Sequence, residues 1–451
     1  MAVFAAGFSA LAVLRQRAFE TGRFDLGNMT QAVWSTAHGR PLDVTELSGD
    51  QISRLGAHVD PILVLFAPLW WLWPSPSMLL AVQAAVIALG ALPVFWLGRK
   101  HLDSAWAGTF CALAYLVYPA VQWLALDEFH PVALACPLLL FAFWYLDEER
   151  LAAFGVFAVL ASLTKEEIPL VVGAMGIWYA LEKGHRAAGI VIALVGATAA
   201  AVSLGVVMPH FREGAPSPFS GRYEAVGGSP GGLVRTVFTD PLAVVEAATG
   251  HRDLVYLLEL GLPLAGLFLL APLAALPAVP ELAANLLSSV STQTSIRFHY
   301  TAPITPFLFA AAILGAASFY RRREGAVILL AASLAGALLV GPLRAGELAP
   351  ARRSQHDRAA ERALALVPPA AATSSTNLLG AHLSERRRVY SFPVVRDAQW
   401  VLVDLKHPSY LDRSSTPSTA AVPLARLLAS GSWRKVFDED GVIVLERTSS
   451  G

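Results

Sequence analysis

Long apolar stretches separated by short polar turns make up the first three quarters of the sequence. Such stretches are typical of helices that cross a bilayer, whose hydrocarbon core takes about 20 residues. The first stretch has 13 residues, which is short for a span, so a start upstream of Met1 stays open. Eleven transmembrane helices are predicted, at residues 2–14, 78–98, 104–123, 131–146, 151–163, 168–181, 187–208, 254–276, 277–293, 303–320 and 325–343.

Basic residues in the short turns predict how these helices are oriented. Clusters of Lys and Arg at 99–100, 183–186 and 321–323 fall on alternate turns, and so on one side of the membrane. Because Lys and Arg are retained on the cytoplasmic side, the N-terminus is predicted to be cytoplasmic. Most ionisable residues then lie in the outer segments, which is where we expect a functional site.

The apolar segment 61–73 is too short to span and ends at a Pro-Ser-Pro sequence. Its tryptophans at 70, 71 and 73 suit an interfacial helix, because an indole ring is stable at the level of the lipid headgroups. We therefore expect this segment to lie on the outer membrane surface.

The density of charge doubles near residue 344. Residues 344–451 hold 26 of the 68 charged side chains in 108 positions, and residues 1–343 hold the other 42. The sequence thus predicts a multi-span core at 1–343 and a small extracytoplasmic α/β domain at 344–451. Because strands alternate with helices, a mostly parallel sheet is expected. The predicted helices are 355–366, 377–384 and 420–429, and the strands are 370–374, 389–392, 400–405 and a hairpin at 433–447.

Composition narrows the class of function. Hydrophobic residues make up 55% of the chain and charged residues 15%, which excludes an ordinary soluble enzyme. The formal net charge is zero, so nucleic acid is not an expected partner. The two cysteines, Cys111 and Cys136, lie in apolar stretches and give neither a disulfide framework nor a zinc spacing.

Two candidate constellations lie in the first outer segment. Asp25, Asn28 and Gln31 have a spacing that places them along one helical face. An N-cap is the alternative role for Asp25. His58 and Asp60 precede the interfacial segment; a helix start explains Asp60 but leaves His58 unexplained.

A third constellation, Asp127, Glu128 and His130, lies at an outer junction between spans. Two acids and a histidine so close together can hold a divalent cation or shuttle a proton. Solvated turn charges are the alternative. Asp127 and His130 are the candidate metal ligands.

A fourth constellation lies between two short spans, so it is expected below the outer surface, where charge needs a partner. Lys165 could pair with Glu166 or Glu167, or could receive a lipid phosphate. Arg297, His299 and Tyr300 add further polar groups on the same side.

These stretches resemble a bacterial family of predicted integral membrane proteins, which is itself similar to the GT-C superfamily of polyprenyl-phosphate-dependent glycosyltransferases. The resemblance extends over nearly the whole chain. The matching stretches are FDLGNMTQAVW (24–34), HVDPILVLFAPLW (58–70), DEFHP (127–131), KEE (165–167), RFHY (297–300) and HLSERRRVYSFP (382–393).

The resemblance implies a GT-C-like core and a membrane glycosyltransferase that moves a sugar from a polyprenyl-phosphate donor to an unidentified extracytoplasmic acceptor. Asp25 matches the essential acid of the first outer loop. The other expected catalytic residues are His58, Asp127, Glu128 and His130. The donor phosphate would be bound by Lys165, Arg297, His299 and Tyr300, and the site would be lined by Asn28, Gln31, Asp60, Glu166 and Glu167.

No Asp-x-Asp pair occurs in the first loop, so a divalent cation is only an optional cofactor. Two other classes of function stay open. A lipid-linked sugar transporter or flippase also needs charge in the membrane, although transporters commonly carry it at mid-span. A non-catalytic membrane scaffold with an outer binding domain is the third possibility.

Overall fold

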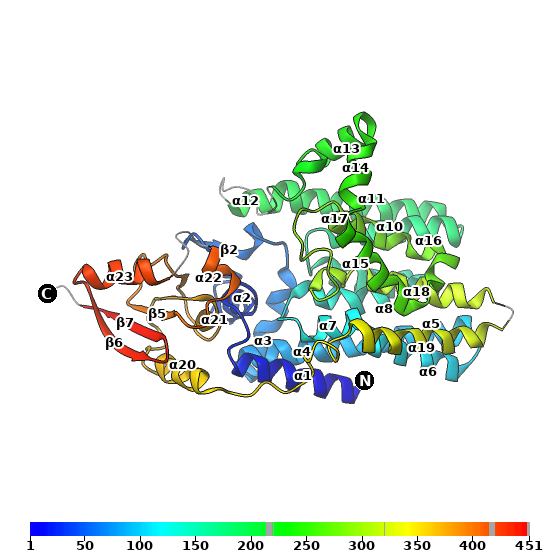
Figure 1. Ribbon diagram of the computed structural model, residues 1–451. Coiled ribbons are helices and arrows are strands. Elements are labelled where there is room, and N and C mark those ends of the chain that lie inside the picture. The colour runs from blue at the N-terminus through cyan, green and yellow to red at the C-terminus, as the bar shows by residue number, and fades with distance from the viewer. Residues whose placement is uncertain (213–218, 220, 320, 415–419, 449–451) are drawn as a thin grey trace.

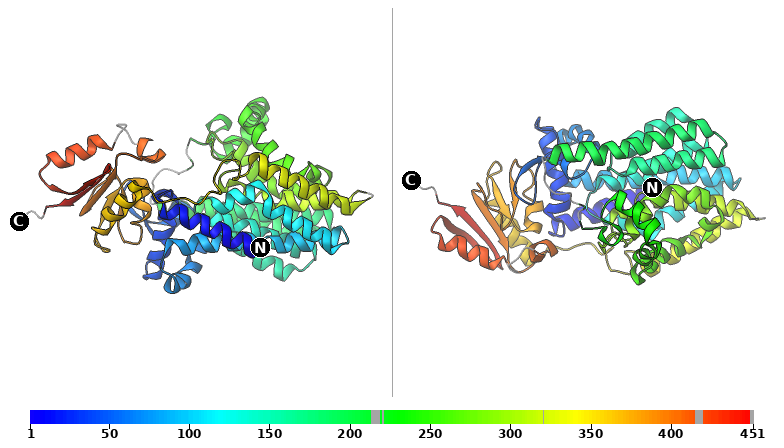
Figure 2. Two further views of the ribbon diagram at one scale, coloured as in Figure 1. Left: turned by 60° about the horizontal axis from the view of Figure 1, so that its bottom comes forward. Right: turned by 90° about the horizontal axis from the view of Figure 1, so that it is seen from above.

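The computed structural model describes residues 1–212, 219, 221–319, 321–414 and 420–448. A helical bundle forms most of the molecule, and a small domain with a sheet lies at one end of it (Figures 1 and 2). The largest cluster of buried apolar side chains lies inside the bundle. Two smaller cores lie on the two faces of the C-terminal sheet, among them Leu402 on one and Val401 on the other.

The bundle is built from helices that run back and forth along its length. The main ones are α1 (Ala2–Arg17), α4 (Pro76–Leu89), α5 (Ala91–His101), α6 (Ala105–Val117), α7 (Pro119–Leu126), α8 (Ala135–Asp147), α9 (Leu151–Ser162), α10 (Ile168–Glu182), α11 (Arg186–Val202), α18 (Thr305–Ala317) and α19 (Arg322–Val340). Shorter helices are α2 (Asn28–Ala37), α3 (Ala67–Leu72), α12 (Met208–Arg212), α13 (Pro230–Thr239), α14 (Pro241–Ala248), α15 (His251–Gly261), α16 (Pro272–Ala275) and α17 (Val279–Leu286).

The predicted number of eleven spans is not confirmed. Among the described residues, three helices are long and apolar enough to cross a membrane, and the bent pair α6–α7 makes a possible fourth. The expected span 254–276 is broken into short pieces, because Ala265 and Gly266 adopt left-handed backbone and prolines interrupt the helix. The last residue of the expected span 303–320 lies outside the described residues.

Ion pairs confirm that the basic turns share one end of the bundle. Lys100 and Lys183 both pair with Asp147, at 2.7 and 2.8 Å, and Arg322 pairs with Asp103 at 3.2 Å. The outer segments of the prediction meet one another at the opposite end, beside the C-terminal domain (Figure 1). The sequence therefore predicted correctly that alternate turns lie at the same end of the bundle.

Segment 61–73 forms a 3-10 helix (Pro61–Phe66) followed by α3. Trp70 is buried, whereas Trp71 and Leu72 are 68% and 83% exposed. The Trp71 indole N–H donates to the carbonyl of Ala37 at 3.1 Å, which holds the segment against α2. One buried side and one exposed apolar side are what an interfacial helix requires.

The C-terminal sheet is mixed rather than mostly parallel. In the described part of the chain its strand order is β4-β3-β5-β7-β6. β3 pairs in parallel with β4 and β5, whereas β7 is antiparallel to both β5 and β6, because the closing hairpin adds its second strand beside β5. The elements are β3 (Thr373–Ser375), β4 (Val389–Ser391), β5 (Trp400–Asp404), β6 (Trp433–Glu439), β7 (Val442–Arg447), and helices α20 (Gln355–Ala365), α21 (Asn377–Ala381), α22 (Tyr410–Ser414) and α23 (Ala421–Ala429).

The first outer segment joins the sheet domain to the bundle. It contains the small antiparallel pair β1 (Asp43–Thr45) and β2 (Gln51–Ser53). The buried Arg23 guanidinium donates to the carbonyls of Val389 and Thr45, at 2.9 and 2.6 Å, and to the Ser391 hydroxyl. This contact fixes the chain immediately before Asp25 against strand β4.

Candidate active site

Asp25 lies in a single π-helical turn, Arg23–Gly27, that leads into α2. The turn is held by its backbone N–H groups: Phe24 donates to the Asn377 side-chain oxygen at 3.0 Å, and Leu26 donates to the Glu128 carboxylate at 2.9 Å. Glu128 also accepts from the N–H of Gly22. The Asp25 side chain remains 40% exposed and makes no N-cap contact to α2, so the alternative role as a cap is wrong.

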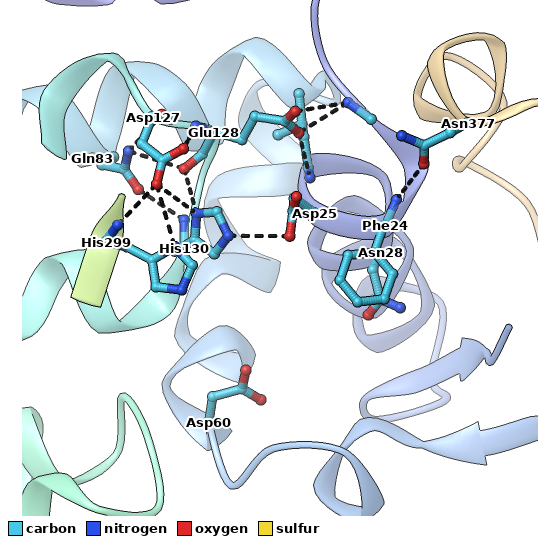
Figure 3. A network of polar contacts seen from close by, with 12 residues as sticks. Phe24, Asp25, Asn28, Asp60, Gln83, Asp127, Glu128, His130, His299 and Asn377 are labelled. Carbon is cyan, nitrogen blue, oxygen red and sulfur yellow. Dashed lines mark hydrogen bonds and ion pairs between the residues drawn. The ribbon is translucent and has the colours of Figure 1, made fainter. Parts of the chain in front are cut away.

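His130 is the partner of Asp25 (Figure 3). Its Nε2 lies 3.2 Å from an Asp25 carboxylate oxygen, and its Nδ1 lies 2.7 Å from the Glu128 carbonyl oxygen. Both nitrogens thus face acceptors, an arrangement that suits the charged imidazolium. Burial alone would lower the pKa of His130, but Asp127 and Asp25 raise it to about 9.

Asp127 connects His130 to His299. The two imidazole rings stack with 3.7 Å between their centres, and His299 Nδ1 lies 3.2 Å from an Asp127 oxygen. The backbone N–H of His299 donates to the same oxygen at 3.1 Å. Burial and the positive His130 keep the pKa of His299 well below its ordinary value. The surroundings therefore favour the charged form of His130 and disfavour the charged form of His299.

Gln83 of α4 fixes the position of this cluster, although the sequence did not single it out. Its side-chain oxygen accepts from the N–H of His130 at 2.9 Å, and its amide nitrogen donates to the carbonyl of Asp127 at 3.1 Å. The signal in the sequence was that Gln83 is the single amide side chain in the apolar stretch 78–98, which indicates a polar partner inside the bundle.

Asp127, His130 and His299 offer ligand atoms that lie within 4.8 Å of one another, close enough to hold a metal ion. A metal ligand must have its ring nitrogen deprotonated. An ion bound here would therefore have to displace the proton that His130 shares with Asp25 or Glu128. The arrangement fits an acid–base pair better than a set of metal ligands.

A cavity of about 210 Å³ adjoins the cluster. The Arg297 guanidinium lies over the Trp123 ring, 5.1 Å from its centre, and has no ion-pair partner within the described residues. Arg15, which the sequence did not single out, pairs with Glu20 and Glu347. The lining residues are Ala12, Arg15, Glu20, Thr21, Leu80, Trp123, Leu126, Asp127, Glu128, Arg297, Phe298 and Glu347.

A second polar cluster surrounds Lys165. Its ammonium group pairs with Glu167 and lies 5.5 Å from the centre of the Tyr300 ring. Glu166 is bound by His58 at 3.0 Å; although burial would raise the pKa of the Glu166 carboxyl, His58 and Lys165 lower it to about 2. Lys165 thus has a carboxylate partner of its own, and its charge also helps to lower the pKa of His299 in the first cluster.

The remaining predicted residues have other partners. Arg54 joins Asp60 to Asn28, with 2.7 Å to each, so Asp60 pairs with Arg54 and makes no side-chain cap for the helix that follows it. Gln31 binds Thr45 and the Arg386 carbonyl, at 3.0 Å each, on the side of the sheet domain. Asp25, Asn28 and Gln31 thus contact three different parts of the molecule.

Glu281 was also missed. It is a buried acid in α17, close enough to Lys165 to interact with it electrostatically. The signal was a single carboxylate inside the apolar stretch 277–293.

Comparison with known proteins places the chain in a family. Residues 15–444 match the family described as "Predicted membrane protein (DUF2079)". The chain belongs to this family. No curated protein matches this DUF2079 chain.

One similar solved structure is ArnT from Cupriavidus metallidurans in the apo state, with 12% sequence identity, 94% coverage of each chain and a TM-score of 0.47.

Proposed function

We propose that this protein is a membrane glycosyltransferase that moves a sugar from a polyprenyl-phosphate donor to an extracytoplasmic acceptor. The observation that carries the proposal is the Asp25–His130 pair: a carboxylate accessible to solvent, held by a buried imidazolium. A cavity lined by Arg297 also contains Asp127 and Glu128, the neighbours of this pair, although Asp25 and His130 are not among its lining residues. The stretches around Asp25, Asp127 and Arg297 resemble the family of predicted membrane proteins, and the similarity of that family to GT-C enzymes supports the same reaction.

In the proposed reaction, an acceptor hydroxyl attacks the anomeric carbon of the donor. The new carbon–oxygen bond forms as the bond from the anomeric carbon to the phosphate oxygen breaks, and the electron pair leaves with the polyprenyl phosphate. Asp25 takes the hydroxyl proton, as a general base does. His130 orients the Asp25 carboxylate through the contact at 3.2 Å, and Asp127 and Gln83 hold His130 in place.

Arg297 is the best-placed group for the departing phosphate. A guanidinium binds two phosphate oxygens at once and neutralises the charge that develops there. Arg297 lines the cavity and makes no ion pair within 4 Å among the described residues, although Glu259 is close enough to interact with it electrostatically, whereas Glu167 pairs directly with Lys165. We therefore propose Arg297 as the principal phosphate ligand; Arg15 lines the same cavity but is already paired with Glu20 and Glu347.

The proposal requires the end that carries Asp25 to lie outside the cytoplasmic membrane, with the N-terminus inside. Single cysteines introduced at Ser48 and at Ser318, in turns at opposite ends of the bundle, test this requirement. Only the cysteine at position 48 should react with a membrane-impermeant maleimide in intact cells. The reverse labelling would contradict the proposed orientation.

The activity is tested with purified protein and radiolabelled polyprenyl-phosphate sugars, in the presence of membrane extract as a source of acceptor. Release of polyprenyl phosphate by the wild-type protein, lost in Asp25→Asn, is the expected result. Asp438→Asn, an exposed carboxylate in β6 of the sheet domain, is a matched control that should remain active. Passage of intact lipid-linked sugar across vesicles, without its cleavage, would instead identify a flippase.

A further inference from the structure

We infer that the C-terminal domain binds a transition-metal ion of the zinc class through His356, Asp404 and His407. One ligand atom from each of these residues lies within 4.8 Å of the others. They come from the start of α20, the end of β5 and the turn that follows β5. The site is separate from the proposed active site and does not depend on the proposed function.

Hydrogen bonds orient the two buried ligands. His356 Nε2 and Asp404 contact each other, so an ion bound here takes the place of a proton between two of its own ligands, whereas the His130 proton is shared with groups outside the ligand set. His356 Nδ1 donates to the carbonyl of Asp440 at 3.0 Å, and its Nε2 faces an Asp404 oxygen at 2.8 Å. The other Asp404 oxygen accepts from the N–H of Lys406 and of His407, at 2.9 and 3.0 Å. Metal-bound histidines and carboxylates commonly have such supporting bonds.

His407 distinguishes this arrangement from a simple buried His–Asp pair. Its ring contacts the His356 ring, with 4.2 Å between the centres, and its nitrogens have no hydrogen-bond partner among the described residues. A His–Asp pair alone gives no reason for a second imidazole beside it. An ion at about 2.0–2.1 Å from each nitrogen would draw the ligands together, and the exposed His407 ring can supply that movement.

The donor set selects the class of ion. Two imidazoles and one carboxylate suit zinc and neighbouring first-row transition metals, whereas Mg²⁺ and Ca²⁺ prefer oxygen ligands. Three protein ligands leave a fourth position for water. Asp404 also ends a strand that is parallel to β3, and the carboxyl ends of parallel strands are common ligand sites in α/β sheets.

Binding of Zn²⁺ to the whole purified protein tests the inference. The protein carries an affinity tag without histidine, is stripped with a chelator, and is titrated with Zn²⁺ in excess Mg²⁺ while bound metal and melting temperature are measured. We expect one ion whose affinity falls at least tenfold in His407→Ala and is restored in His407→Cys, because a thiolate is also a zinc ligand. Zn²⁺ should raise the melting temperature of the wild type but not of His407→Ala.

His299→Ala separates this site from the histidine pair in the bundle. That variant should still bind the ion with the affinity of the wild type. Co²⁺ should give a visible absorption band that changes in His407→Cys. Equal Zn²⁺ affinity in the wild type and His407→Ala would overturn the inference, provided that the circular dichroism and elution volume of the variant match those of the wild type; so would loss of binding only in His299→Ala.

Discussion

The two ends of the bundle both concentrate charge, but they use it differently. At the end with the basic turns, the buried Asp147 carboxylate is paired with Lys100, His101 and Lys183, at 2.7, 2.9 and 2.8 Å. At the other end, Asp25 has a single ring nitrogen as its ion-pair partner and is 40% exposed. One cluster is closed and fully paired; the other is open and adjoins a cavity.

This difference separates a structural charge cluster from a functional one. A buried carboxylate that is already bound by two ammonium groups and an imidazole has no free oxygen for a ligand, and its removal costs stability. A half-exposed carboxylate beside an imidazolium can exchange its proton with a bound molecule. The number of charges alone does not distinguish the two ends, whereas pairing and access do.

The largest expected effect is the loss of stability in Asp147→Asn. Asp147 is buried and its three partners are partly exposed, with Glu148 as a second partner for Lys100, so the loss of its charge is expected to cost about 1–3 kcal/mol. The melting temperature in detergent should fall sharply, while the activity of the molecules that remain folded is retained. Asp25→Asn should show the reverse, with a small change in melting temperature and a loss of activity of at least about a hundredfold. Similar melting temperatures for the two variants would contradict the comparison.

The next largest effect is the change in stability with pH that His130 causes. His130 has a pKa of about 9 in the folded protein, against 6.5 as its ordinary value. Because the folded pKa is raised, its contribution to stability is fully present below pH 6.5 and is lost as the pH rises through about 9. It amounts to about 3 kcal/mol at most, at about 1.4 kcal/mol for each pH unit.

The measurement is the difference in melting temperature between the wild type and His130→Gln from pH 6 to pH 10. Taking this difference removes the titration of groups remote from His130, but not that of Glu128 and His299, whose pKa values respond to the charge of His130. We expect a difference that is largest at pH 6 and shrinks toward pH 10. A difference that grows with pH would show that His130 is neutral in the folded protein.

Sequence reasoning succeeded where the signal was local and failed where it was not. Apolar stretches and turn parity depend on neighbouring residues, so most of the long helices and the hairpin at 433–447 were predicted, whereas the described residues of the expected span 277–293 contain only one α-helix, the short α17. The cluster depends on contacts such as His299 to Asp127, which are 172 positions apart. The role of Gln83 likewise lies in distant partners that no local pattern encodes. The prolines in segment 254–276 were a local signal that the helix is broken. The high hydrophobicity of the segment nevertheless led to the prediction of one continuous span.

A smaller effect, on KM for the lipid donor, is expected when cationic side chains near the proposed site are removed. Arg297→Ala should raise KM for the lipid donor about tenfold, which corresponds to the loss of one charge-assisted hydrogen bond of about 1.5 kcal/mol. Arg323→Ala, at the other end, is the matched control and should leave KM unchanged. Lys165→Ala should mainly lower the melting temperature, because Glu167 loses its partner. If Lys165→Ala raises KM more than Arg297→Ala does, the phosphate is bound at Lys165 instead.

The smallest effect is expected from Asp103, which also lies at the end with the basic turns. Asp103 pairs with Arg322 at 3.2 Å, but its side chain is 69% exposed. Exposed pairs contribute about 0–1 kcal/mol because water and salt screen them. Asp103 has a φ of 51°, a left-handed conformation that Asn also tolerates, so Asp103→Asn removes the charge without straining the backbone. Its melting temperature should stay close to that of the wild type at both low and high salt. A loss as large as that in Asp147→Asn would mean that the number of charges at this end, rather than their burial, stabilises the bundle.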